Sequence, residues 1–225
     1  MRIELTRDTH LMTDRYHVPG TQGDFQPGSG DQVLANKVGI TTPEDMDELE
    51  LGLLTQLYED VLINQLPDRQ LTVADLQTWH RRWLGNVYAW AGQERVVNMS
   101  KGSFMFAAAP QISRLLAEFE SNCLIRWTPC HDMDTETLVE AIAVTHVELI
   151  LIHPFREGNG RLSRLLADVM AVQSGREPLD YSTWEAHKAD YIGAIQQGLL
   201  TNYAPMKYWV AQALGSEGQS LKLPA

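Results

Sequence analysis

Residues 153–164 contain the side chains of this chain that could do chemistry, in the order His-Pro-Phe-Arg-Glu-Gly-Asn-Gly-Arg-Leu-Ser-Arg. His153 has an ordinary pKa of about 6.5, which suits an imidazole that takes a proton from an attacking hydroxyl group. Glu157 is a carboxylate among positively charged groups, a position that favours a Mg²⁺ ion bridging the carboxylate to phosphates. The segment therefore predicts a base and a metal ligand within one short stretch.

The middle of this segment predicts an anion site. Pro154 cannot continue the helix before it, so the Gly-Asn-Gly turn at residues 158–160 is expected to open the next helix. The first N–H groups of a helix have no intrahelical partner, and glycines let a phosphate approach them closely. Arg161 and Arg164 can both reach over that turn with forked guanidinium groups, which suits a polyphosphate. Together these residues indicate nucleotidyl or phosphoryl transfer to a hydroxyl group.

Each of these features also has an ordinary structural explanation. A histidine before a proline is commonly a residue at a helix end, and a Gly-Asn-Gly turn is commonly a tight connection between helices. Arginines at helical spacing commonly lie on a solvated face, and Phe155 is expected in the core. The ordered combination of base, metal ligand, anion site and arginine pair favours the chemical interpretation.

Two apolar helices are expected to flank this segment and to hold it in place. Residues 135–152 are the most apolar helical stretch and are expected at the centre of the fold. The helix after the segment has apolar residues at helical spacing, namely Leu162, Leu165, Leu166, Val169 and Met170. The sequence thus predicts a central buried helix pair.

Other elements are expected around this pair. Capping signals at Thr42 and Thr72 predict the starts of two earlier helices. Apolar spacing predicts three further helices, at residues 112–119, 184–197 and 206–214. Residues 94–106 alternate in polarity on either side of a Ser-Lys-Gly-Ser turn, which predicts a β-hairpin. The predicted fold class is all-α, with one small hairpin.

The length of 225 residues and the 44% hydrophobic content fit one soluble domain. Residues 1–35 are expected to form a partly extended N-terminal arm, because the stretch from about residue 16 is rich in Gly and Pro. The helical domain is expected at residues 36–214. Residues 215–225 are expected to form a flexible C-terminal tail.

Charge and composition exclude several classes of protein. The net charge of −11 argues against a dedicated nucleic-acid binder. Cys123 and Cys130 are too few for a disulfide framework, and no metal-ligand spacing surrounds them, which indicates a reduced compartment. The N-terminus lacks the apolar core of a secretory signal, and the apolar run at residues 138–152 is shorter than the ~20 residues that cross a membrane. We expect a cytoplasmic protein without a membrane partner, with delivery into another cell left open.

The segment at residues 153–164 resembles the motif of the Fic family, His-Pro-Phe-x-(Asp/Glu)-Gly-Asn-Gly-Arg-x-x-Arg, and matches it at every fixed position. Residues 36–40, 79–92 and 97–102 also look like Fic landmarks, so the resemblance spans about residues 16–212. It implies a compact Fic-type helical domain with a β-hairpin flap. It also implies a toxin or effector enzyme that uses ATP and Mg²⁺ to transfer AMP to a Ser, Thr or Tyr hydroxyl of a target protein.

The resemblance gives each motif residue a role. His153 is implied to be the general base, and Glu157 is implied to hold Mg²⁺. The implied nucleotide-binding residues are Gly158, Asn159, Gly160, Arg161 and Arg164, the last of which pairs with the γ-phosphate. The implied flap residues, which hold the target by strand-like backbone pairing, are Ser100, Lys101 and Gly102.

Many Fic proteins are inhibited by a helix with the pattern (Ser/Thr)-x-x-x-Glu-(Gly/Asn), whose glutamate captures the second motif arginine. The nearest match here runs from Thr55 to Glu59, and Asp60 then departs from the pattern. We therefore expect inhibition by a separate small antitoxin that supplies the glutamate, with Glu59 as the alternative. The oligomeric state is not predicted.

Several alternatives stay open. Transfer of UMP or another nucleotide, or removal of AMP, would use the same motif, and Tyr191, Asn202 and Tyr203 are candidates for the wall that binds the base. Phosphate-transferring relatives have Lys at the position of Gly160, which disfavours that branch. A metal-dependent hydrolase would use His146, His153 and Glu157, but it leaves the anion site unexplained. A catalytically silent Fic-fold interaction module would be distinguished by the absence of nucleotide turnover.

Overall fold

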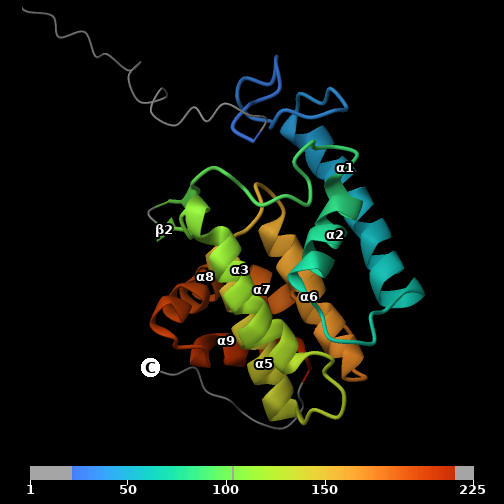
Figure 1. Cartoon of the computed structure of the whole chain (residues 1–225), viewed down its shortest axis with the longest axis vertical. Helices are drawn as coiled ribbons and strands as arrows, with labels where there is room; N and C mark the ends of the chain where they lie inside the picture. Colours follow the sequence, from blue (N-terminus) through green and yellow to red (C-terminus); the bar gives the residue numbers. More distant parts are fainter. Residues whose placement is uncertain (1–21, 103, 216–225) are drawn as a thin grey trace, which may run out of the picture.

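The computed structural model describes residues 22–102 and 104–215 (Figure 1). These residues form helices and one two-stranded hairpin, which confirms the predicted all-α class. Most of the arm expected at residues 1–35, and all but the first residue of the tail expected at 215–225, lie outside the described residues. Among the residues described, no helix is long and apolar enough to cross a membrane.

The first two helices begin at the capping residues that the sequence predicts. Helix α1, Pro43–Tyr58, starts after Thr42, whose side chain accepts a hydrogen bond from a backbone N–H of the first turn. Helix α2, Val73–Leu84, starts with a capping box in which Thr72 and Asp75 each bond the other's backbone N–H. These local bonds fix where both helices enter the fold.

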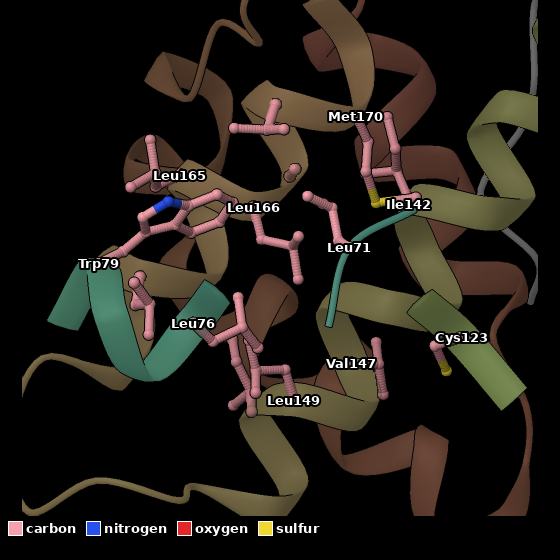
Figure 2. Close-up of a cluster of buried hydrophobic side chains, with 14 of the residues drawn as sticks. Leu71, Leu76, Trp79, Cys123, Ile142, Val147, Leu149, Leu165, Leu166 and Met170 are labelled. Carbon is pink, nitrogen blue, oxygen red and sulfur yellow. The ribbon is translucent and has the colours of Figure 1, made fainter. Parts of the chain in front are cut away.

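The central helix pair is α5, Thr135–Ile152, and α6, Asn159–Gln173, which pack against each other. Helix α5 is buried around most of its circumference, because its sequence is apolar on nearly every face. Figure 2 shows part of the core around the pair, including Ile142, Val147, Leu149, Leu165, Leu166 and Met170. The predicted boundaries of α5 are confirmed, so the reactive segment begins directly where α5 ends.

The remaining helices surround the pair. They are η1 (Glu59–Asn64), η2 (Ala109–Gln111), α3 (Ile112–Phe119), η3 (Glu120–Leu124), α4 (Ile125–Trp127), α7 (Ser182–Ala186), α8 (Lys188–Gln197), η4 (Gly198–Leu200) and α9 (Ala204–Ala213). Figure 1 shows α1 and α2 on one side of α5 and α6, and α7, α8 and α9 on the other. The single helix predicted at residues 184–197 is wrong, because His187 has a non-helical backbone and separates α7 from α8.

The predicted hairpin is confirmed, with β1, Ser100–Lys101, antiparallel to β2, Phe104–Met105. The described part of the arm lies against the base of this hairpin. The Gln22 side chain accepts a hydrogen bond from the N–H of Val96 at 2.7 Å and donates one to the carbonyl of Glu94 at 3.1 Å. The arm is thus ordered here because it packs on the helical domain.

We predict that Gly198→Ala destabilises the fold, because η4 touches α5 at this residue. A Cβ atom at Gly198 would lie 2.2 Å from Cγ1 of Val147, far inside van der Waals contact. Overpacking of this kind costs about 1–3 kcal/mol, measurable by urea unfolding. Gly52→Ala in α1 is the matched control, because its Cβ would meet nothing within 4 Å and should stabilise the helix by about 0.5–1 kcal/mol. Equal effects of the two variants would contradict the packing argument.

Candidate active site

The site begins at a strained residue. His153 follows α5 with φ 52° and ψ 59°, the left-handed conformation, and its N–H still bonds the carbonyl of Leu149 at 3.0 Å. Such a backbone costs a residue with a side chain about 1–3 kcal/mol and persists only where its surroundings enforce it. Pro154 prevents the helix from continuing, so α5 ends at Ile152.

The imidazole of His153 is held in one orientation. Its ring stacks on Phe106 at a centroid distance of 3.7 Å, and Nδ1 lies 3.3 Å from the carbonyl oxygen of Ile150. Because a carbonyl oxygen can only accept, Nδ1 carries the proton and Nε2 is left as the basic nitrogen. The side chain lines a cleft of about 780 Å³, where Nε2 can serve as a base.

The expected pKa of His153 is wrong. Burial, together with the charges of Arg95 and Lys101, lowers the pKa of its imidazole to about 4. The sequence shows a histidine next to a proline but not the side chains that cover it. His153 is consequently neutral at physiological pH, which is the form that accepts a proton.

The glycine turn expected before α6 is present, and it precedes the helix start directly. Gly158 has φ 79°, and a Cβ there would lie 2.5 Å from the ring of Trp83, so both its conformation and its packing require glycine. The Asn159 side chain accepts from the N–H of Phe155 at 2.8 Å and donates to its carbonyl at 2.7 Å. Asn159 therefore closes the loop with its side chain and leaves backbone N–H groups at the helix N-terminus, beside Gly160.

His80 of helix α2 supports this loop, although the sequence did not single it out as functional. His80 is buried, its Nδ1 accepts from the N–H of Gly92 at 2.8 Å, and its Nε2 donates to the carbonyl of Glu157 at 3.0 Å. Its ring also stacks on Phe155 at 4.1 Å. Burial lowers the pKa of His80 to about 4, so the ring stays neutral and keeps both hydrogen bonds.

Arg161 is fixed by a buried carboxylate. The guanidinium lies 2.6 Å from Glu50, 3.3 Å from Glu157 and 4.7 Å from the ring of Trp83. The side chain of Glu50 is only 3% exposed and also accepts a hydrogen bond from Tyr88 at 2.7 Å. Burial raises the pKa of Glu50, while the charge of Arg161 opposes that shift. Arg161 is thereby oriented before any ligand arrives.

Arg164 is paired with an exposed carboxylate. Its guanidinium is 2.5 Å from Glu185 of α7 and 4.9 Å from the ring of Tyr181. The Glu185 side chain is 54% exposed, so this ion pair is accessible to water. Glu59, the residue that the sequence offered as a possible inhibitor, is instead exposed at the start of η1.

Some of the other expected residues line the cleft, and others do not. Ser100, Lys101 and Gly102 line the cleft, as expected of a flap, and Tyr191 of α8 lines it as well. Asn202 and Tyr203 are wrong as base-wall candidates. Asn202 bonds Gln197 and Ala204, and Tyr203 lines a separate groove and donates to Glu148. Helix α8 forms this wall of the cleft instead, with Lys188, Tyr191, Ile192, Ile195 and Gln196.

The metal-hydrolase alternative is not supported. His146 is 1% exposed, with its two ring nitrogens 3.2 Å from the Ser163 hydroxyl and 2.8 Å from the Tyr191 hydroxyl. Within residues 22–102 and 104–215, no group of three or more His, Cys, Asp or Glu side chains could hold a metal ion. His146 instead holds Tyr191 in the cleft wall.

Comparison with known proteins identifies a family model and several relatives that match this chain. Residues 70–171 match the model of the Fic/DOC family. The matched residues are a Fic/DOC domain. A probable protein adenylyltransferase of Sinorhizobium fredii, y4lH, is 28% identical over 177 residues, which cover 79% of this chain and 88% of that protein. A protein adenylyltransferase Fic of Aedes aegypti is 32% identical over 81% of this chain and 36% of its own length. The chain thus spans most of the bacterial relative and about a third of the mosquito one.

Solved structures share the fold. The N-terminal Fic domain of an effector protein from Bartonella sp. AR 15-3 matches with a TM-score of 0.73 at 21% identity, covering 88% of this chain and 93% of that one. BepC of Bartonella tribocorum, solved with bound AMPPNP, matches with a TM-score of 0.68 at 22% identity, covering 85% and 96%. The predicted Fic-type architecture, with its central helix pair and small hairpin, is confirmed.

We predict that the folded protein loses stability in acid because of three histidines, of which His80 and His146 are buried and His153 is half-buried. Burial lowers the pKa of His80 to about 4, of His146 to about 3 and of His153 to about 4. Below pH ~6.5 the unfolded chain therefore binds protons that the folded chain does not. As the pH is lowered, the free energy of unfolding decreases by about 1.4 kcal/mol per pH unit for each such proton. Asp168 and Glu50 have the opposite sign, because burial raises the pKa of both carboxyl groups, that of Asp168 to about 6, and they offset part of this loss.

Urea unfolding at pH values between 7.5 and 5.0 measures this effect. His146→Asn should reduce the pH slope by about one proton. A stability that stays constant over this range would show that the three histidines are not neutral in the folded protein.

Proposed function

We propose that this Fic protein is a protein adenylyltransferase, which transfers AMP from ATP to a Ser, Thr or Tyr hydroxyl of a target protein. One observation carries the proposal: a neutral, oriented His153 lies in the same cleft as the α6 N-terminus, Arg161 and Arg164. The relative in Sinorhizobium fredii is a probable protein adenylyltransferase and that in Aedes aegypti a protein adenylyltransferase Fic, which supports this activity. We take residues 36–214 as the Fic domain.

The residues divide the reaction between them. Nε2 of His153 takes the proton of the target hydroxyl, whose oxygen forms a bond to the α-phosphorus of ATP. The bond from that phosphorus to the β-phosphate oxygen breaks, and pyrophosphate leaves. The backbone N–H groups of Asn159 and Gly160, together with Arg161 and Arg164, hold the phosphates and stabilise their charge. The N–H of Gly158 donates to the Glu157 carboxylate at 2.9 Å and would join them when that bond opens.

Glu157 fits the role of a magnesium ligand. Its side chain is 42% exposed and lines the cleft, where the expected polyphosphate would supply further oxygens. Mg²⁺ in such sites is commonly bound by one or two carboxylates together with substrate phosphates and waters, so a single carboxylate is sufficient. When bound, the ion would neutralise charge that develops on the phosphates.

The flap is proposed to hold the target. The short strand β1, Ser100–Lys101, and Gly102 line the cleft beside His153, and a strand edge can pair with an extended peptide. The target segment would then place its hydroxyl near Nε2. A cytoplasmic location remains a prediction from the sequence, and cell fractionation would test it.

The decisive test is the mass of the protein after incubation with ATP and Mg²⁺. We expect an added AMP on the wild-type chain through self-modification, and a loss of about 10²–10⁴ in rate for His153→Ala, the usual contribution of a general base. His131→Ala, a change of the exposed histidine, is the matched control and should keep the wild-type rate.

Other outcomes are informative. An adduct with UTP or CTP, but not with ATP, would keep the mechanism and change the donor. The absence of an adduct with every nucleotide would contradict transfer and favour the silent interaction module.

We further propose that inhibition comes from a separate small antitoxin that supplies a glutamate. Glu59 is exposed at the start of η1, and the carboxylate on Arg164 is that of Glu185. An exposed ion pair is worth about 0–1 kcal/mol, so displacing Glu185 costs less than about fivefold in ATP affinity. This is too little for an internal inhibitor.

Expression of the chain alone should therefore be toxic to bacteria. Glu59→Gly should leave the toxicity unchanged, and Glu185→Ala should lower half-saturating ATP by less than about fivefold. Low toxicity that rises with Glu59→Gly, or a much larger effect of Glu185→Ala, would place the inhibitor within this chain.

A further inference from the structure

Arg95 is a buried arginine whose side chain bonds only backbone carbonyl oxygens. The residue is 1% exposed. Its Nε donates to the carbonyl of His153 at 2.6 Å, and Nη1 donates to that of Val97 at 2.6 Å. Nη2 donates to the carbonyls of Ala107 at 2.6 Å and Ile152 at 3.3 Å. One guanidinium thus joins four positions of the backbone.

These four carbonyls belong to two parts of the site. Ile152 and His153 are at the C-terminus of α5, where carbonyls lack intrahelical partners and the helix dipole is negative. Val97 and Ala107 are at the two ends of the flap hairpin, one before β1 and one after β2. Arg95 therefore fixes the backbone of the base and both ends of the flap relative to one another.

The chemistry of the side chain explains why an arginine is needed. Burial lowers the pKa of Arg95 to about 10, so it stays charged at neutral pH and is stabilised by the carbonyl dipoles around it. The guanidinium is planar and presents its donors in a fixed fork, whereas a lysine ammonium is a point charge on a flexible stem. A lysine would keep the charge but could not hold carbonyls from both parts of the site in fixed directions.

The main chain of the same region reinforces this link. The N–H of Arg95 donates to the carbonyl of Pro154 at 2.8 Å, and the N–H of Ala107 donates to that of Leu151 at 3.2 Å. Phe106, the residue after β2, stacks on the His153 ring. The backbone around His153 and the backbone of the flap are therefore also bonded to each other directly.

We propose that Arg95 is a positioning residue that sets the flap at a fixed distance from His153, so that a peptide paired with the flap presents its hydroxyl to Nε2. This inference rests on the proposed transfer of AMP to a protein hydroxyl. The bonds of Arg95 go to none of the nucleotide-binding residues, so its loss should affect the acceptor side of the reaction and spare nucleotide binding.

Two substitutions of Arg95 separate the role of its forked donor geometry from the role of its positive charge. Arg95→Lys keeps the charge, and Arg95→Gln removes both charge and fork. Arg82→Lys is the matched control, because Arg82 is an exposed partner of Asp60. For both Arg95 variants we expect self-modification at saturating ATP to slow about tenfold or more, the effect of losing one or two hydrogen bonds. Half-saturating ATP should stay within about twofold of the wild-type value.

Two further measurements do not depend on activity. Hydrogen exchange of the flap amides at residues 97–107 should accelerate about tenfold in both variants, relative to the amides of α6. The NMR titration of His153 should move its pKa upward in Arg95→Gln, which lacks the nearby positive charge, and much less in Arg95→Lys. If the wild-type chain forms no nucleotide adduct, the proposed function fails, and these two measurements still decide the role of Arg95.

Three results would overturn the proposal. The first is unchanged exchange of the flap amides in a folded variant. The second is a rise in half-saturating ATP equal to the loss of rate, because that would place Arg95 on the nucleotide side. The third is failure of Arg95→Lys to fold, because that would make Arg95 a residue required for the fold rather than one that positions the flap.

Discussion

The end of α5 is the constraint on which the rest of the site depends. A buried apolar helix must stop here with its last carbonyls away from water, and Pro154 prevents the next turn from satisfying them. The chain resolves this with His153 in a left-handed conformation and with the Arg95 guanidinium on the freed carbonyls. The strain at His153 is tolerated because Arg95, Phe106 and Ile150 hold the residue from different sides.

The cleft is rich in positive charge, although the chain as a whole is negative. The net charge is −11, yet the cleft is lined by five basic side chains, Lys101, Arg156, Arg161, Arg164 and Lys188, and by two acidic ones, Glu157 and Glu185. Such a cleft attracts a polyanion even in an acidic protein. The two motif arginines differ in how they are prepared for it. Arg161 is held by the buried Glu50, whereas Arg164 faces the exposed Glu185 and can exchange that partner for a phosphate.

The sequence predicted what short-range physics determines. Capping at Thr42 and Thr72, the apolar stretch of α5 and the glycine turn before α6 are local signals, and the structure has each of them. It could not predict partners that tertiary packing brings together. Glu50 is 111 residues from Arg161, and Arg95 is 58 residues from His153. For the same reason the pKa of His153 and the base-wall candidates Asn202 and Tyr203 were wrong.

The low pKa of His153 fits a base that becomes stronger when its substrate binds. In the free protein, burial and the charges of Arg95 and Lys101 keep the imidazole neutral, but they also make Nε2 a weak acceptor of protons. A polyphosphate bound at the α6 N-terminus brings negative charge close to the ring and favours its protonated form, which raises the pKa. Proton transfer is most efficient when the pKa of the base lies near the working pH. On the proposed function, the nucleotide itself would therefore bring His153 toward that value, and the base would be weakest when no donor is present.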